Sequence, residues 1–116
     1  MTARRVYPKA VRIRRRREFL ALQREGRRRH STHFVVIQHP SSSVASRLGV
    51  TVSKRVGNAV VRNRVKRLVR EVFRHRQAEL RPPTDLVVIA KPGANTLTYA
   101  QAATELERIL EIVADR

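Results

Sequence analysis

Residues 54–74, KRVGNAVVRNRVKRLVREVFR, carry the pattern around which the rest of the chain is organised. Apolar residues recur at helical spacing and form one face: Val61, Val65, Leu68, Val69, Val72 and Phe73. Polar and basic residues form the opposite side and its flanks: Arg62, Asn63, Arg64, Lys66, Arg67, Arg70 and Arg74. The spacing predicts a helix from about Asn58 to Gln77 that covers a sheet with one side and offers the other to a polyanion.

The charge of the whole chain supports this interpretation. The formal net charge is +17, from 26 Lys and Arg against 9 Asp and Glu. Two segments hold the excess, because residues 1–30 carry 12 cations against 2 acids and residues 54–76 carry 9 against 1. Such clustering is typical of nucleic-acid binders. With 41% hydrophobic residues among 116, the chain should still fold as a globular domain.

The cellular compartment is inferred from the lack of cysteine and of long apolar runs in the sequence. Without cysteine there is no disulfide framework, thiolate catalysis or Cys-based zinc site, which fits a reducing compartment. No apolar run approaches the roughly 20 residues that span a bilayer, so no membrane association is expected. The sequence predicts a cytoplasmic protein without a stable protein partner. An organelle transit peptide is the alternative reading of the Arg-rich start.

The first part of the chain predicts a flexible basic arm over residues 1–12, followed by one domain over residues 13–116. A short helix is expected from about Arg14 to Glu25, with Gly26 as its C-terminal cap. Its first turn, residues 14–17, places four arginines at the positive end of the helix dipole. That arrangement is unfavourable until an anion neutralises it, and therefore indicates anion binding.

Three further apolar segments predict strands. Residues 33–38 and 48–52 are rich in β-branched residues, and the loop of serines between them favours an antiparallel hairpin. Residues 86–90 are wholly apolar, as in a strand buried on both faces. A last helix should begin at the capping-box pattern Thr98 to Gln101. The expected fold is an α/β (α+β) two-layer sandwich with three helices on a small sheet of three to four strands, including a βαβ unit.

No set of residues for catalysis by the protein alone is evident. The acidic residues are scattered, and the densest group, Glu105, Glu107, Glu111 and Asp115, is predicted to lie on a solvent-facing side of the last helix. The histidines form no metal-binding motif, and His75 is interpreted as a phosphate contact. Two readings of Phe19 stay open: a core aromatic or a base-stacking side chain.

A set of motifs extends along most of the chain, at residues 17–19, 34–36, 47–55, 57–60, 62–70, 85–90 and 97–99. Through these motifs the chain, from about Ile13 to Leu110, resembles the protein subunit of bacterial ribonuclease P. It implies a ribonucleoprotein endonuclease that removes the 5′ leader from precursor tRNA, with chemistry by an RNA subunit and its bound magnesium ions. It also implies a left-handed βαβ crossover, contrary to the general rule.

The resemblance assigns roles to individual positions. Residues expected to bind the catalytic RNA are Lys54, Arg55, Arg62, Asn63, Arg64, Lys66, Arg67, Arg70 and Arg74. Residues expected to bind the single-stranded leader are Phe19, Arg14, Arg16, Arg17 and Ser53. Two positions depart from the family pattern, since Gln23 and Ile37 stand where members often carry aromatics. Leader binding is therefore expected to depend more on cations and hydrogen bonds.

Two other functions remain as alternatives. A ribosomal or assembly protein would have similar charge and a similar small fold, and a standalone nuclease would cleave RNA without an RNA subunit. Because anions that bind only the folded state stabilise it, phosphate or sulfate ions are expected to act as folding ligands for so basic a chain.

Overall fold

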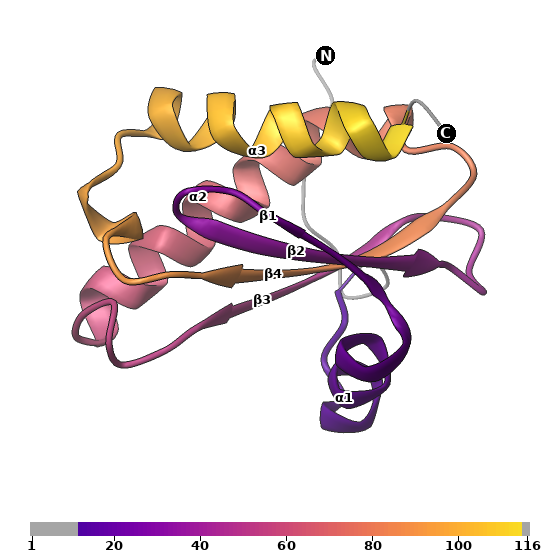
Figure 1. Cartoon of the computed structure of the whole chain (residues 1–116), viewed down its shortest axis with the longest axis horizontal. Coiled ribbons are helices and arrows are strands. Elements are labelled where there is room, and N and C mark those ends of the chain that lie inside the picture. Colours follow the sequence, from indigo (N-terminus) through magenta and orange to yellow (C-terminus); the bar gives the residue numbers. More distant parts are fainter. Residues whose placement is uncertain (1–11, 115–116) are drawn as a thin grey trace, which may run out of the picture.

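The computed structural model describes residues 12–114. Its helices are α1 (Arg16–Glu25), α2 (Ala59–Arg76) and α3 (Tyr99–Ala114), and its strands are β1 (Arg27–His30), β2 (Phe34–Pro40), β3 (Arg47–Val52) and β4 (Thr84–Ala90). Two short 3-10 turns, η2 (Gln77–Glu79) and η3 (Ala94–Thr96), flank β4. As Figure 1 shows, α2 and α3 form one layer over the sheet, and α1 packs on the opposite face. The predicted α+β class is confirmed.

The strand order differs from the simplest expectation. The order is β1-β2-β4-β3, with β2 antiparallel to both neighbours and β3 parallel to β4. The predicted hairpin between residues 33–38 and 48–52 is therefore wrong, since β4 lies between β2 and β3. The apolar side chains of β4 alternate to both faces, and a central position buries both sets. The βαβ unit β3-α2-β4 is confirmed, and its left-handed sense stays a prediction.

Strand β1 was not expected, because its sequence, Arg27-Arg28-Arg29-His30, has none of the composition of a strand. It forms by pairing antiparallel with the outer edge of β2, with His30 opposite Val35. At the other edge of the sheet, Ile13 donates its backbone N–H to the carbonyl of Leu48 at 2.9 Å. Arg12 also bridges Leu48, and the predicted basic arm otherwise lies outside the described residues.

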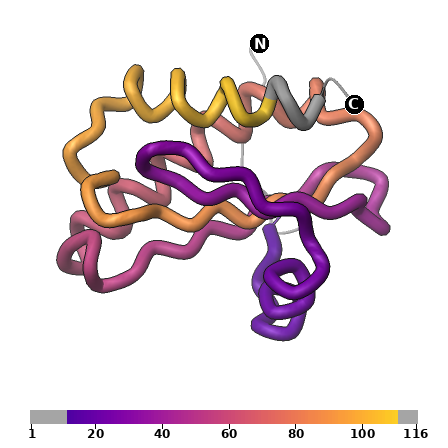
Figure 2. Tube along the Cα trace, in the orientation of Figure 1, coloured from indigo at the N-terminus to yellow at the C-terminus, as the bar shows by residue number. Residues whose placement is uncertain are grey.

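The sheet separates two apolar clusters. The larger one lies between the sheet and the layer of α2 and α3, and includes Phe34, Leu48, Leu86, Val69 and Phe73. The smaller lies on the other face, called the α1 face below, and its buried members are Ile13, Leu22, Val35, Ile37 and Val87. Helix α1 is short and stands against only part of the sheet, an arrangement that the trace in Figure 2 also shows. Among residues 12–114, no helix covers the rest of the α1 face.

The predicted helix ends are largely confirmed. The Asn58 side chain accepts a hydrogen bond from the Val61 N–H at 3.0 Å and starts α2. Thr98 and Gln101 form the reciprocal capping box, with distances of 3.2 and 2.9 Å. Gly26 ends α1, and its N–H donates to the Leu22 carbonyl at 2.8 Å. A Cβ there would lie 2.4 Å from the Ile37 side chain, so the close packing of α1 on β2 requires glycine.

A group of charged side chains fixes α1 to the sheet. The Arg47 guanidinium donates to both carboxylate oxygens of buried Asp85, at 3.0 and 2.7 Å, and to Glu18 of α1 at 2.9 Å. The hydrogen bonds to Asp85, followed by those to Glu18, raise the pKa of Arg47 despite its partial burial. Since a bidentate guanidinium–carboxylate pair has a fixed geometry, this contact sets the position of the first turn of α1.

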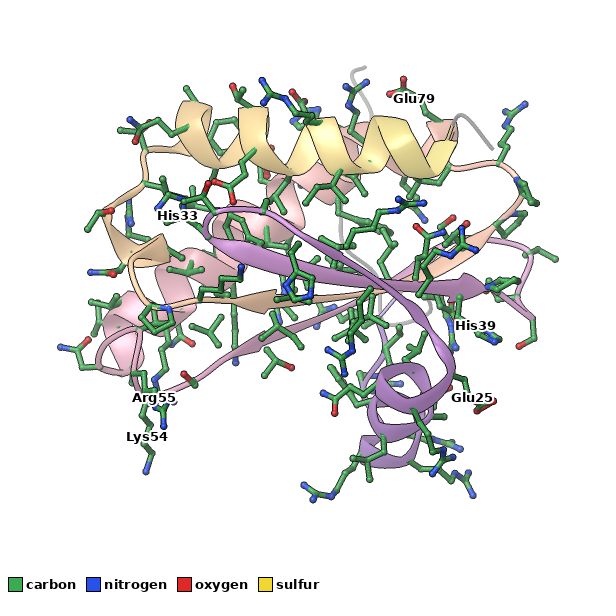
Figure 3. The ribbon with its side chains drawn as sticks, in the orientation of Figure 1. Glu25, His33, His39, Lys54, Arg55 and Glu79 are labelled. Carbon is green, nitrogen blue, oxygen red and sulfur yellow. The ribbon has the colours of Figure 1, made fainter. Side chains whose placement is uncertain are left out.

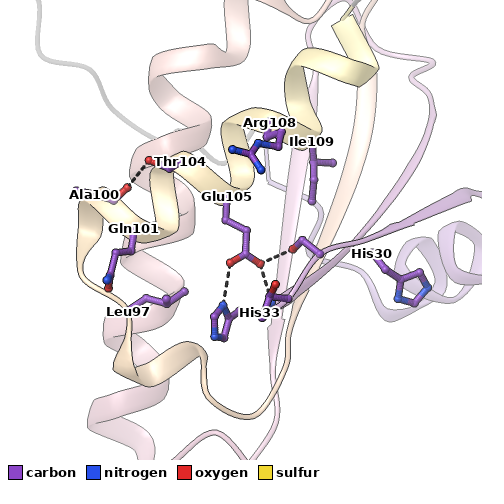
Figure 4. Close-up of a pocket in the computed structure, with 11 residues that line it drawn as sticks. His30, His33, Leu97, Ala100, Gln101, Thr104, Glu105, Arg108 and Ile109 are labelled. Carbon is purple, nitrogen blue, oxygen red and sulfur yellow. Dashed lines mark hydrogen bonds and ion pairs between the residues drawn. The ribbon is translucent and has the colours of Figure 1, made fainter.

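Glu105 corrects the expectation of a solvent-facing acidic group on α3. Its carboxylate accepts hydrogen bonds from the Ser31 hydroxyl, the His33 backbone N–H at 2.6 Å and the His33 ring at 2.8 Å (Figure 4). Helical spacing marks the outer side of α3, but the turn between β1 and β2 covers this part of it. Glu105 thus joins α3 to the end of the β1–β2 hairpin.

In the described range, 12–114, no helix is long and apolar enough to span a bilayer.

Glu105 gives the fold a testable pH dependence. Burial raises its pKa, but the hydrogen bonds from Ser31 and His33 outweigh that effect, and the pKa lies below its ordinary value of 4.5. A lowered pKa in the folded state stabilises the fold above the ordinary value, and this contribution is lost as the pH falls through the folded-state pKa. Glu105→Gln should therefore lower the free energy of unfolding by about 1–2 kcal/mol at pH 7 and by less below pH ~4.

Urea unfolding at a series of pH values measures this difference. Glu25→Gln, which changes an exposed acid of α1, is the matched control and should change the unfolding free energy little at any pH. A Glu105→Gln effect that stays constant from pH 7 to pH 3 would contradict the assignment.

Candidate nucleic-acid interface

Helix α2 is both a wall of the core and a charged surface. Its inward residues Val65, Val69, Val72 and Phe73 are almost completely buried against the sheet and α3. Its other side follows the prediction from the sequence: Asn63, Arg64 and Arg67 are exposed, whereas Arg62, Lys66, Arg70 and Arg74 are half-buried. Because the apolar side is fixed in the core, the cations are held in a defined row on a rigid element.

The loop that leads into α2 extends this charged surface. Ser53, Lys54 and Arg55 follow directly after β3 and are all exposed. In Figure 3 the side chains of Lys54 and Arg55 extend from this loop on the side of the sheet where α1 lies. The loop thus stands between the row of cations on α2 and the α1 face.

Arg64 has a structural contact that sequence reasoning missed. Its guanidinium donates to the backbone carbonyls of Asn95, at 3.2 Å, and Leu97, at 2.9 Å. These carbonyls belong to η3 and the connection into α3, so Arg64 ties the exposed side of α2 to that connection. Helical spacing alone could not show this contact, because the partners are more than 30 residues away.

The charge of α2 is not evenly compensated along the helix. Glu71, its only acid, accepts hydrogen bonds from Arg74 and, at 3.0 Å, from the His75 ring. The hydrogen bond from Arg74, followed by that from His75, lowers the pKa of Glu71. The interpretation of His75 as a phosphate contact is therefore weakened. Uncompensated positive charge is concentrated at residues 54–67, before Glu71.

The second candidate region lies at α1. Arg14, Arg16 and Arg17 are exposed around its N-terminus, and no side chain within residues 12–114 caps that end. Glu18, the one acid of the first turn, is held by Arg47. The prediction that residues 14–17 form the first turn is wrong in part, because α1 begins at Arg16 and Arg14 lies before the N-cap residue Arg15. Arg16 and Arg17 lie in the first turn, where the helix dipole is positive.

Phe19 lies where α1 meets the sheet. A Cβ added to Gly49 would come within 2.7 and 2.8 Å of two atoms of the Phe19 ring, so the ring rests on the bare backbone of β3. The side chain is half-buried. The reading as a core aromatic is supported, because Phe19 packs against the smaller cluster, whereas base stacking stays a prediction for the part of the ring that is open to solvent.

The strand register shows which residues continue this surface. Thr51 pairs with Ile89, and Ile89 pairs with Val35, so these three side chains form a row across the α1 face. Ile89 is the one residue of β4 that is not buried. The next row, Gly49, Val87 and Ile37, contains two fully buried side chains and lies beneath α1. Thr51 and Ile89 are half-buried and Val35 is buried, so this row, called the open row below, is only partly accessible. Sequence reasoning missed it because it assigned β3 to the wrong neighbour.

The structure shows the surroundings of Ile37 and Gln23, the two residues that stand where family members often carry aromatics. Ile37 is completely buried, and its methyl group contacts the position where a Cβ of Gly26 would lie. Gln23 is half-buried on α1, and its backbone carbonyl accepts a hydrogen bond from Arg28 at 3.2 Å. Phe19 is therefore the one aromatic ring that the smaller cluster supplies within the described residues.

Residues 12–114 contain no group of three or more His, Asp or Glu side chains that could hold a metal ion. The arrangement can bind and orient an anionic polymer through cations, backbone groups and one aromatic ring.

Comparisons with known proteins agree on one family. The family model described as Ribonuclease P matches residues 7–114. The ribonuclease P protein component of Desulfatibacillum aliphaticivorans is 42% identical over 109 residues, which are 94% of this chain and 92% of the relative. The structure of the Staphylococcus aureus RNase P protein superimposes with a TM-score of 0.81 at 35% identity, covering 90% of this chain and 95% of that one. The Thermotoga maritima RNase P protein gives 0.79 at 31% identity, covering 87% and 96%.

The contact between Phe19 and Gly49 can be tested through their coupling. Gly49→Ala should destabilise the fold by about 1–3 kcal/mol, because the new methyl group overlaps the ring. In a Phe19→Leu background the same substitution should cost less, since the shorter side chain leaves room for the methyl group. Urea unfolding of the four proteins gives the coupling energy. Additive effects would mean that the ring does not rest on Gly49.

Proposed function

The chain belongs to the ribonuclease P protein family, as the protein subunit of the ribonucleoprotein that processes precursor tRNA, and we propose that it acts through two separate RNA-binding surfaces. The first is the charged side of α2 with the loop before it, which docks on the catalytic RNA. The second is the α1 face with Phe19, which holds the single-stranded 5′ leader of the substrate. The first surface fixes the second beside the RNA active site.

The charge distribution supports the first surface. Lys54 and Arg55 lie in the loop before α2, and Lys66 and Arg67 lie on α2 itself. Within residues 12–114 no carboxylate forms a hydrogen bond or ion pair with these four cations, because the one acid of α2, Glu71, pairs with Arg74 and His75. Repulsion among such cations is relieved when phosphates approach. Arg62, Asn63 and Arg70 extend the same surface. Arg64 and Arg74 complete the docking face. The carbonyls of Asn95 and Leu97 orient the Arg64 side chain, and Glu71 orients that of Arg74.

The open part of the α1 face supports the second surface. A single strand of RNA is bound in proteins by aromatic and apolar platforms for its bases and by cations for its phosphates. Phe19 provides the platform here, Arg14, Arg16 and Arg17 provide positive charge at the start of α1, and Ser53 provides a hydroxyl at the end of β3.

The RNA subunit carries the chemistry in this proposal. Magnesium ions would be held by that RNA and the substrate. The protein residues neutralise phosphate charge and position the leader, and they need not exchange a proton with the substrate. The bacterial cytoplasm is the proposed location, in keeping with a chain that has no cysteine.

One observation carries the proposal: a single helix is fixed in the core by its apolar side and presents a row of cations on the other. Reconstitution tests it. Added to a bacterial ribonuclease P RNA at low magnesium, the protein should enhance cleavage of precursor tRNA at the 5′ leader junction. Cleavage that is the same with and without the protein would refute the function, and cleavage by the protein without RNA would refute the division of labour.

Lys66 and Arg67 provide the sharpest variant of the docking face. The double substitution Lys66→Ala and Arg67→Ala should weaken binding of the RNA subunit and reduce the slope of log affinity against log salt by up to about 0.9 for each phosphate that is no longer neutralised. A filter-binding titration at several salt concentrations measures both quantities. Arg108→Ala, which removes an exposed cation from α3, is the control. An unchanged slope would exclude the two residues from the interface.

Anion binding should also appear in the free protein. Because sulfate would bind the row of cations only when α2 is folded, sulfate should increase folding. Circular dichroism at low salt, followed during a sulfate titration, should show a gain of helical signal that chloride at equal ionic strength does not reproduce. A signal that does not respond to sulfate would contradict this prediction.

A further inference from the structure

Strand β1 presents a different pair of side chains to each face of the sheet. Arg28 pairs with Ile37 and His30 with Val35, and both partners belong to the cluster on the α1 face. Side chains of paired residues lie on the same face, so Arg28 and His30 face the side of α1. Arg27 pairs with Gln38, and the Arg29 guanidinium donates to the Gln38 side chain at 3.2 Å. Arg27 and Arg29 therefore face the layer of α2 and α3.

Arg28 and His30 lie at the β1 end of two of the rows that cross the α1 face. The covered row runs from Gly49 through Val87 and Ile37 to Arg28, and the open row runs from Thr51 through Ile89 and Val35 to His30. Both rows begin at β3 and end at β1, and Thr51 of the open row lies two residues before Ser53. The open row is polar at its two ends and apolar in the middle, where half-buried Ile89 and buried Val35 lie.

Both side chains at the β1 end are accessible. Arg28 and His30 are exposed. One guanidinium nitrogen of Arg28 donates to the Gln23 carbonyl at the end of α1, which holds the group beside the helix and leaves its other N–H groups available. Figure 4 shows the ring of His30 pointing away from Glu105, whereas His33 points toward it.

We propose that Arg28 and His30 are further contacts for the single-stranded 5′ leader, at the edge of the sheet opposite to β3. The inference rests on the proposed function of the α1 face. The leader enters beside Ser53 and Phe19, lays its bases over the apolar middle of the open row, and places a phosphate between Arg28 and His30. Four strands span about 14 Å, and sheets of this width carry two or three bases in other RNA-binding domains.

The competing explanation is that the charges of β1 only prevent an exposed edge strand from pairing with another chain. Under that explanation Arg27 and Arg28 are equivalent, because each adds one charge to the same edge. Under the proposal they differ, because they face opposite sides of the sheet. The chain therefore contains its own matched control.

The test uses the reconstituted holoenzyme and precursor tRNAs that differ in leader length. Arg28→Ala with His30→Ala should weaken binding of a substrate with a leader of six or more nucleotides by about tenfold, the cost of losing one charge-assisted hydrogen bond. Binding of a substrate with a one-nucleotide leader should be unchanged. Arg27→Ala should leave both affinities unchanged. Arg28→Gln with His30→Gln, which preserves polarity on the edge, is the second variant and should show the same dependence on leader length.

Two results would overturn the inference. Equal losses for long and short leaders would mean that Arg28 and His30 act on the fold or on the RNA subunit. Equal losses for Arg27→Ala and the Arg28 and His30 variant would mean that only the total charge of the edge matters. Failure of the proposed function is distinguishable, because the unmodified holoenzyme would then bind long-leader and short-leader substrates equally well.

Discussion

The burial of β4 on both of its faces is the constraint on which the rest of the structure depends. Five apolar residues, Leu86–Ala90, cannot be placed at an edge or against solvent, so the strand must lie inside the sheet with a layer on each side. Helices α2 and α3 provide one complete layer. On the other side, α1 is short and covers the rows that contain Asp85 and Val87. Ile89, one row further along β4, is left half-buried and packs against the edge of the smaller cluster, as Phe19 does.

This unequal covering links the fold to the proposed function. The complete layer needs an amphipathic helix between β3 and β4, and the outer side of that helix is available for cations that dock on RNA. The incomplete layer leaves an apolar surface with polar edges, which suits a single strand of RNA. Arg47 determines which part of the α1 face is covered, because its contacts to Asp85 and Glu18 fix the position of α1 on the sheet.

The sequence predicted the parts of the fold that local patterns determine. Helix α2, its Asn58 cap, the capping box at Thr98 and the buried strand at residues 86–90 follow from spacing and side-chain chemistry within a few residues. The pairing of β3 with β4, the edge strand β1 and the hydrogen bonds of Glu105 to Ser31 and His33 were missed, because each depends on contacts with distant residues. The charged side of α2 was recognised from spacing, whereas the open row at Ile89 required the register of the sheet.

Cross-linking from single cysteines tests the division into two RNA surfaces most directly, since the chain contains no cysteine of its own. A photoactivatable group would be attached to Arg67→Cys on α2 or to Thr51→Cys on the α1 face, and each protein would be assembled with the RNA subunit and a precursor tRNA. We expect position 67 to cross-link to the RNA subunit and position 51 to the 5′ leader. Cross-links from both positions to the same RNA, or the reverse assignment, would contradict the division.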